Sequence, residues 1–174
     1  DVPPTLVSFA VTTEHVNHII SPEFKQAGHK VVLCKPEYDA NGLPTTESLK
    51  ALFAQVNTLM REGKVCAAYT PTYGGIAEAI LKMAMGNDIG FTYANGLTKE
   101  DIFGYQYGAF VLELNTDDEI GICLGTTGGN AIVKDGVSIA LQELYDVYES
   151  KLEPIYSCNL KTEKTEIPTI TYQA

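Results

Sequence analysis

The sequence predicts an α+β fold, in which a mixed, mostly antiparallel sheet packs against helices. Two stretches, 45–63 and 75–86, repeat apolar residues at three- and four-residue steps, as amphipathic helices do. Short apolar stretches rich in β-branched residues alternate with them along the chain, which indicates intermixed strands and helices. Two late apolar stretches, 108–114 and 119–124, are joined by four polar residues. This link is too short for a parallel crossover, so the sheet is predicted to be mostly antiparallel.

The first part of the chain is predicted to contain two strands and one helix. Residues 6–11 and 30–34 are rich in the residue types that suit strands, and residues 39–44 carry a clear loop signal. A helix begins at Thr45 or Thr46, either of which can cap it, and stops at Gly63. Its apolar stripe is expected to consist of Leu49, Leu52, Phe53, Val56, Leu59 and Met60.

The middle of the chain is predicted to alternate short strands with helices. Residues 65–69 form a strand that leads into a second helix, which ends at Gly86. The buried stripe of this helix is expected to be Ile76, Ala79, Ile80, Met83 and Ala84. Residues 89–93 form a further strand, and residues 99–103 a short helix.

The last part is predicted to be an antiparallel meander followed by a helix. Its strands are 108–114, 119–124 and 130–133, and residues 125–130 form a hairpin turn. The glycine-rich composition of 125–130 is not a phosphate loop, because it lacks the Gly-Lys-Ser/Thr ending and precedes a strand. The last helix starts near Val137. It is expected to turn Val137, Ala140, Leu141, Leu144 and Tyr148 inward.

Composition and charge restrict the classes of function. The chain has 174 residues, with 22 acidic against 12 basic side chains and a net charge of −10. Such a surface repels phosphate backbones and anionic lipids, so no nucleic acid and no membrane are expected as partners. No apolar run approaches the roughly 20 residues that span a bilayer. Because the chain opens on Asp1 without a signal-like start, we interpret it as a piece of a longer polypeptide. The sequence turns polar from Cys158 onward, so we expect one domain at 1–157 and a linker-like tail at 158–174.

The four cysteines are predicted to be reduced and structural. Cys34, Cys66, Cys123 and Cys158 show no zinc or redox spacing, and the first three have apolar neighbours in the sequence. The histidines at positions 15 and 18 are interpreted as loop or surface residues, so no metal site is expected. A reducing, cytoplasmic location agrees with this cysteine usage.

The best candidate site is the loop before the second helix, with Thr70, Thr72, Gly74 and Gly75. Glycines let a ligand approach the backbone, and the first N–H groups of a helix can hold an anion such as phosphate. The two threonines offer hydroxyl donors to the same spot. Tight turn geometry alone explains a glycine pair about twice as often as a ligand does, given how often glycine occurs in turns. Tyrosines 105 and 107 could line a pocket, although such residues usually serve the core or an interface.

Several segments resemble the C-terminal domains of AIR-synthase-related enzymes. The opening residues 1–7, the stretch 20–33 and the strand 121–125 follow the order of that family. Residues 68–76 lie where the family carries a His-Asp-x-Ser-Asp-Gly-Gly-Leu signature, and residues 102–108 are similar to its Leu-Phe-Gly-Glu-x-x-Gly segment. Residues 1–10 and 151–156 are most similar to the second such domain of the single-chain phosphoribosylformylglycinamidine synthases, just before their glutaminase domain.

This resemblance implies a domain of an ATP- and glutamine-dependent ligase of purine biosynthesis. ATP and magnesium are implied for the parent enzyme and no cofactor for this chain; the implied partners are a homologous first half and the glutaminase domain. The signature's His and two Asp are replaced by Tyr69, Thr70 and Tyr73, and the Glu of the second segment by Tyr105. These losses imply a non-catalytic, structural domain. The alternative is a free-standing binding module for a phosphorylated metabolite or nucleotide.

Overall fold

Seven strands form one mixed sheet in the computed structural model, which describes residues 5–157. The strand order is β2-β4-β1-β5-β3-β6-β7, and every neighbouring pair of these strands is antiparallel except β3 and β6. The predicted α+β class with a mostly antiparallel sheet is therefore confirmed. The strands are β1 Lys30–Cys34, β2 Val65–Tyr69, β3 Phe91–Tyr93, β4 Phe110–Leu114, β5 Ile122–Thr127, β6 Ala131–Lys134 and β7 Val137–Ala140.

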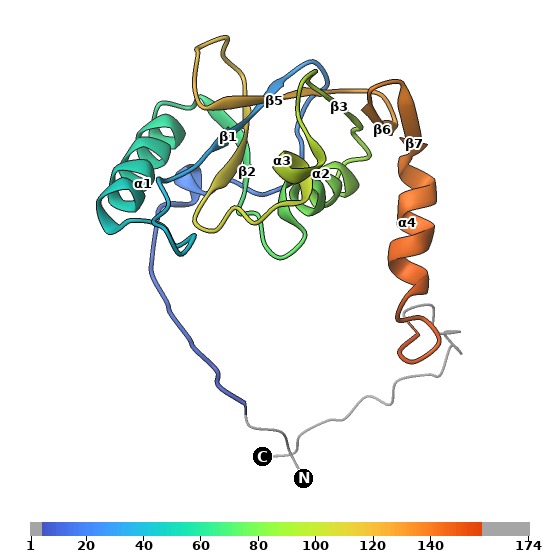
Figure 1. Cartoon of the computed structure of the whole chain (residues 1–174), viewed down its shortest axis with the longest axis horizontal. Coiled ribbons are helices and arrows are strands. Elements are labelled where there is room, and N and C mark those ends of the chain that lie inside the picture. The colour runs from blue at the N-terminus through green and yellow to red at the C-terminus, as the bar shows by residue number, and fades with distance from the viewer. Residues whose placement is uncertain (1–4, 158–174) are drawn as a thin grey trace, which may run out of the picture. The chain divides into compact units, whose positions relative to one another are not determined.

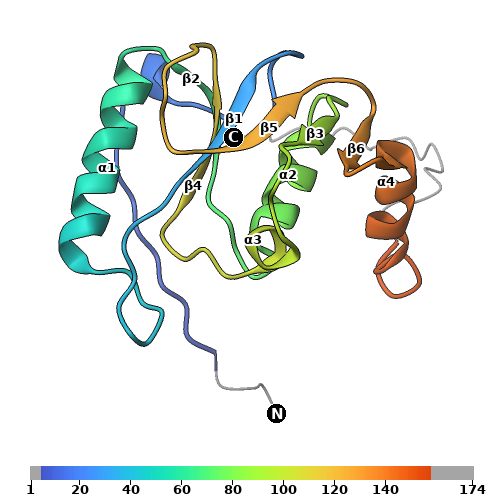
Figure 2. The same ribbon diagram turned by 45° about the horizontal axis from the view of Figure 1, so that its top comes forward.

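Two longer helices cover opposite faces of this sheet. Helix α1, Thr46–Arg61, lies on one side of the strands, whereas α2, Gly75–Met85, lies on the other beside the short α3, Lys99–Phe103 (Figure 1 and Figure 2). A 3-10 turn, η1, precedes them at Val16–His18. Helix α4, Leu141–Ser150, follows β7. Residues up to Leu141 form one compact unit and the residues that follow form another, so α4 is described by itself.

Helix α1 packs on the sheet through the apolar stripe that the sequence predicts. Leu52, Val56 and Leu59 are buried. They join a cluster with alternate residues of three strands, namely Val32, Cys34, Val65, Leu112 and Leu114. Phe53, also expected in the stripe, is half exposed and meets Phe110 edge to face. A strand turns successive side chains to opposite faces, so the residues between these alternate positions face away from α1.

Helix α2 buries every residue of its predicted stripe: Ile76, Ala79, Ile80, Met83 and Ala84. Its end at Gly86 is also confirmed, since Gly86 is the C-cap. The segment before β1 lies against the end of this helix, because the N–H of Phe24 donates to the carbonyl of Met83 at 2.8 Å. Phe24 itself is fully buried and stacks on Phe91 of β3. This side of the sheet positions the candidate site described below.

The predicted meander of late strands is wrong. Strands β4 and β5 do not pair with each other; each pairs antiparallel with β1 from opposite sides, so they run parallel to one another. The segment 115–121 crosses from the end of β4, beside Lys30, to the start of β5, beside Leu33. Five strand residues span only about 16 Å. Seven extended residues reach about 23 Å, so a helix is not needed for this crossover.

Two further predictions for the late segments are also wrong. Residues 125–130 are not a hairpin turn, since Gly125, Thr126 and Thr127 continue β5, and β6 pairs with β3. The last helix does not start near Val137. Residues 137–140 form β7, and the turn Asp135-Gly136 has positive φ at both positions (49° and 80°), as a type I′ hairpin requires. Of the residues expected to turn inward, Leu141 alone is buried among the residues described.

The expected strand at residues 6–11 is not formed. This segment is extended, pairs with none of the seven described strands and exposes its apolar side chains. A β-rich sequence forms a stable strand only when a neighbouring strand takes up its hydrogen bonds. Among the cysteines, Cys34 is buried, Cys66 half-buried and Cys123 exposed, and all three are free. Cys158 and the tail 158–174 lie outside the described residues, so these parts of the prediction, like the domain boundary, remain untested.

Candidate functional site

The predicted loop connects the end of β2 to the start of α2, as the sequence indicates. Thr70 and Thr72 are exposed, Gly74 is the N-cap of α2, and Gly75 is its first residue. The two glycine N–H groups are not free. The N–H of Gly75 donates to the carbonyl of Thr72 at 3.1 Å, and the N–H of Gly74 donates to a side chain of the helix itself.

That side chain is Glu78, one turn into α2. Its Oε2 accepts hydrogen bonds from the Gly74 N–H at 2.8 Å and from the Thr72 hydroxyl at 2.6 Å. Its Oε1 accepts from Lys82 Nζ at 2.6 Å. The hydrogen bonds from Lys82, Thr72 and Gly74 together lower the pKa of Glu78 to about 2. The carboxylate of Glu78 therefore lies where an anion held by this loop would be expected.

Each glycine of the loop has a packing role in this arrangement. A Cβ on Gly74 would lie 2.6 Å from the Cβ of Glu78 and 2.9 Å from its Oε2, so the missing side chain leaves room for the glutamate. Gly75 has φ +65°, and a Cβ there would lie 2.6 Å from the carbonyl oxygen of Gly104. This close approach joins the start of α2 to the end of α3.

Exposed tyrosines lie beside the loop. Tyr73 is 80% exposed, and its ring meets Tyr105 edge to face with centroids 5.6 Å apart. Tyr105 stacks on Tyr107 at 5.4 Å. The Tyr38 hydroxyl donates to the carbonyl of Tyr107 at 3.0 Å. Tyr73 thus lies against the other tyrosines, and Glu78 is the side chain that fills the loop.

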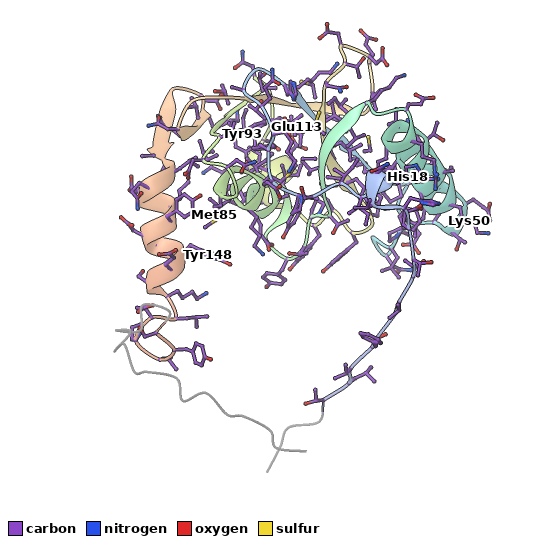
Figure 3. All side chains as sticks on the ribbon, turned by 180° about the vertical axis from the view of Figure 1, so that it is seen from behind. His18, Lys50, Met85, Tyr93, Glu113 and Tyr148 are labelled. Carbon is purple, nitrogen blue, oxygen red and sulfur yellow. The ribbon has the colours of Figure 1, made fainter. Side chains whose placement is uncertain are left out.

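A second carboxylate on this side of the sheet was missed by the sequence reasoning. Glu113 of β4 is fully buried and faces away from α1; Figure 3 shows it within the body of the protein. Its oxygens accept from the N–H groups of Lys25 at 2.8 Å and Gln26 at 3.1 Å, and Oε1 pairs with His29 Nδ1 at 2.7 Å. Glu113 thereby fixes the loop 24–29 to the sheet.

Thr127 of β5 holds the other side of the same loop. Its hydroxyl donates to the carbonyl of Gln26 at 2.6 Å and accepts from the N–H of His29 at 2.9 Å. The N–H of Gly28 donates to the carbonyl of Thr127 at 2.7 Å. The cluster is therefore a set of loop anchors whose polar groups satisfy one another.

The described residues bring together few other reactive groups. Burial, with a smaller contribution from the charge of Glu113, raises the pKa of the Cys66 thiol, which makes it a weak nucleophile. Within residues 5–157, no group of three or more His, Cys, Asp and Glu side chains is placed to hold a metal ion. A shallow hollow of about 400 Å³ lies at the start of α1, lined by residues such as Lys35, Ser48 and Gln55, and includes none of the predicted site residues. None of the helices described is long and apolar enough to cross a membrane.

Comparison with known proteins relates this chain to the protein PurL. No family model matches the sequence. The subunit PurL of phosphoribosylformylglycinamidine synthase from Methanothermobacter marburgensis is 28% identical over an alignment 176 positions long, gaps included, which covers 82% of this chain and 25% of the relative. PurL from Allorhizobium ampelinum is 30% identical over an alignment of 112 positions, which covers 55% of this chain and 15% of the relative. The chain is similar to part of PurL. It spans about a quarter or less of the length of these relatives.

Solved PurL structures show the same fold. Phosphoribosylformylglycinamidine synthase II from Thermotoga maritima superposes with a TM-score of 0.59 at 10% identity, over 74% of this chain and 28% of that one. PurL from the same organism, complexed with FGAR, gives a TM-score of 0.58. The expected AIR synthase-like fold is thus confirmed.

Proposed function

We propose that this chain is a non-catalytic structural domain of a PurL-type phosphoribosylformylglycinamidine synthase. The synthase is an ATP- and glutamine-dependent ligase that converts formylglycinamide ribonucleotide to its amidine in purine biosynthesis. The similarity to a quarter of PurL and the shared fold support this assignment. Within the parent, the chain corresponds to the second AIR-synthase-related C-terminal domain. Its partners are the homologous first half and the glutaminase domain, in the cytoplasm, and ATP and magnesium act outside this chain.

The observation that carries the structural role is the position of Glu78. An anion site needs free donors, and here the Thr72 hydroxyl and the Gly74 N–H both donate to the protein's own carboxylate. Lys82, the nearest cation to this carboxylate, forms an ion pair with it at 2.6 Å. A phosphate would have to displace a carboxylate that is already bound by three donors, at a cost of several hydrogen bonds. The loop thus closes on itself and joins β2 to α2.

The experiment removes one of these donors in the complete synthase. Thr72→Val deletes the hydroxyl that donates to Glu78, while Thr70→Val removes an exposed hydroxyl of the same loop as a matched control. We expect kcat and KM for both variants to stay within about threefold of the wild type, because a loop outside the catalytic centre contributes no transition-state binding. A folded Thr72→Val enzyme that loses 100-fold or more in kcat/KM would show a catalytic loop. A wild-type protein without ATP- and glutamine-dependent amidine formation would refute the parent function instead.

Phosphate titration separates this proposal from the binding-module alternative. In the wild-type chain we expect the backbone amides of residues 72–76 to shift little in NMR spectra at tens of millimolar phosphate. Glu78→Ala frees the donors of Thr72 and Gly74 and leaves Lys82 without its carboxylate partner, so phosphate-dependent shifts should appear in this variant alone. Saturable shifts in the wild type below about 1 mM phosphate would favour a binding module.

A further inference from the structure

Residues 6–11 form an apolar surface that nothing in the described chain covers. Leu6, Val7, Phe9 and Val11 are 96%, 79%, 87% and 75% exposed. In Figure 1 the segment is the blue trace that leaves the body on the side of α1. Glu14, which follows this segment, attaches the chain to the body, because its carboxylate pairs with Arg61 at the end of α1 at 3.1 Å. The segment beyond this attachment is thus presented outward.

The sequence of this segment suits a β-strand. It contains no glycine, proline or charged residue, and Val7, Phe9 and Val11 alternate with small side chains at positions 8 and 10. In a strand this pattern places one continuous apolar face opposite a face of Leu6, Ser8 and Ala10. A lone strand leaves its backbone hydrogen-bonding groups unpaired, so such a segment is stable only when it adds to a sheet edge.

The seven-stranded sheet described above does not supply that edge. Its outer strands are β2 and β7, and each pairs with one neighbouring strand and not with residues 6–11. The PurL relatives, by contrast, contain far more polypeptide, since the matched stretch is 25% of the M. marburgensis protein and the fold match covers 28% of the T. maritima chain. An acceptor sheet is therefore to be sought in that additional polypeptide.

We infer that residues 6–11 are a strand that completes the edge of a sheet in the part of the PurL-type protein outside this chain. Val7, Phe9 and Val11 face the core of that second sheet. The backbone N–H and C=O groups of the segment form hydrogen bonds with the edge strand of that sheet. The attachment of Glu14 to Arg61 then makes the segment a strand shared between two folded bodies. The inference rests on the proposed function only in that the chain is part of a longer PurL-type polypeptide.

Hydrogen exchange tests this inference in the complete gene product, with the 174-residue chain as reference. In the chain alone the amides of residues 6–11 should exchange at the rate of an unstructured peptide. In the complete protein they should exchange at least 100-fold more slowly, because ladder hydrogen bonds protect them. The exposed turn at Asn95 and Gly96 is the internal control and should exchange equally in both.

A substitution gives a second, independent readout. Phe9→Ser should leave the thermal midpoint of the 174-residue chain unchanged and lower that of the complete protein by about 3 °C or more. Ser8→Thr, on the opposite face of the strand, should change neither by more than about 1 °C. Equal exchange of residues 6–11 in both proteins overturns the inference. Protection that grows with the concentration of the 174-residue chain also overturns it, because a second copy would then be the partner.

The two proposals, the shared strand and the synthase function, can fail independently of each other. A complete protein that protects residues 6–11 but forms no amidine retains the shared strand and loses the synthase assignment. A complete protein that forms the amidine while residues 6–11 exchange freely retains the synthase assignment and loses the shared strand.

Discussion

Two loops on the α2 side of the sheet are each fixed by a glutamate carboxylate that accepts hydrogen bonds from backbone and side-chain donors. Glu113 holds residues 24–29, and Glu78 holds residues 72–74. The chemistry is the same, but Glu113 is fully buried whereas the side chain of Glu78 is 22% exposed. Water can replace the contacts of Glu78 and cannot reach those of Glu113. Burial therefore decides which carboxylate is an anchor for the fold and which only closes a loop.

The largest effect is expected from removing the buried carboxylate. Glu113→Ala leaves the N–H groups of Lys25 and Gln26 and the ring of His29 without their acceptor. We expect the free energy of unfolding, measured by urea denaturation, to fall by about 4 kcal/mol. Glu113→Gln keeps one acceptor oxygen and should lose about half as much, which keeps the test valid if the alanine variant does not fold. A loss below about 1 kcal/mol for both variants would contradict the anchoring role.

An intermediate loss of unfolding free energy is expected from a backbone substitution at Gly75 in the second loop. Gly75→Ala places a Cβ 2.6 Å from the carbonyl oxygen of Gly104 in a residue with φ +65°. Gly63 has nearly the same φ, +69°, with nothing within 4 Å of its Cβ position, so Gly63→Ala isolates the conformational cost. We expect losses of about 3 kcal/mol for Gly75→Ala and about 1 kcal/mol for Gly63→Ala. Equal losses would mean that the close approach of α2 and α3 adds nothing.

The smallest effect is expected from Glu78 and should depend on pH. The pKa of Glu78 is lowered from 4.5 to about 2, so its contribution to stability is fully present above pH 4.5 and is lost as the pH falls toward 2. Wild type and Glu78→Gln should differ by about 1 kcal/mol in unfolding free energy at pH 7. The difference should shrink steadily between pH 4.5 and 3. A difference that stays constant over this range would show that the ionised carboxylate is not what closes the loop.

The parts of the fold that depend on local sequence pattern were predicted well. The stripes of α1 and α2 follow from apolar residues at three- and four-residue steps, and β1, β2 and α3 follow from residue type and flanking turns. Which strands become neighbours depends on contacts between distant residues. The sequence of 115–121 therefore did not reveal that β1 lies between β4 and β5. The strand β7 had a local signal, Asp135-Gly136, that was overlooked.

The sequence located the loop between β2 and α2 but not the contacts of Glu78 with it, and anion binding there stays a prediction. The glycines and threonines of residues 70–75 mark the start of α2, yet the side chain that uses their donors lies four residues beyond Gly74. Glu78 and Lys82 are four residues apart on the helix, as ion pairs on a helix surface often are. This spacing is the signal that could have indicated a carboxylate bound by neighbouring donors of the chain itself. Glu113 gave no comparable signal. A single acidic residue inside a strand normally marks the solvent face, and here a loop distant in sequence covers it.

The central position of β1 has a consequence for synthesis of the protein. Both neighbours of β1 come from residues 110–127, so the strand has no partner until this later stretch is available. A chain emerging from the ribosome must carry Val31, Val32 and Leu33 without sheet pairing while the two major helices are being made. The later synthesis of β4 and β5 then provides a neighbour on each side of β1 through long-range contacts. Folding of this protein is therefore expected to be slow and to complete only after residue 127 has left the exit tunnel.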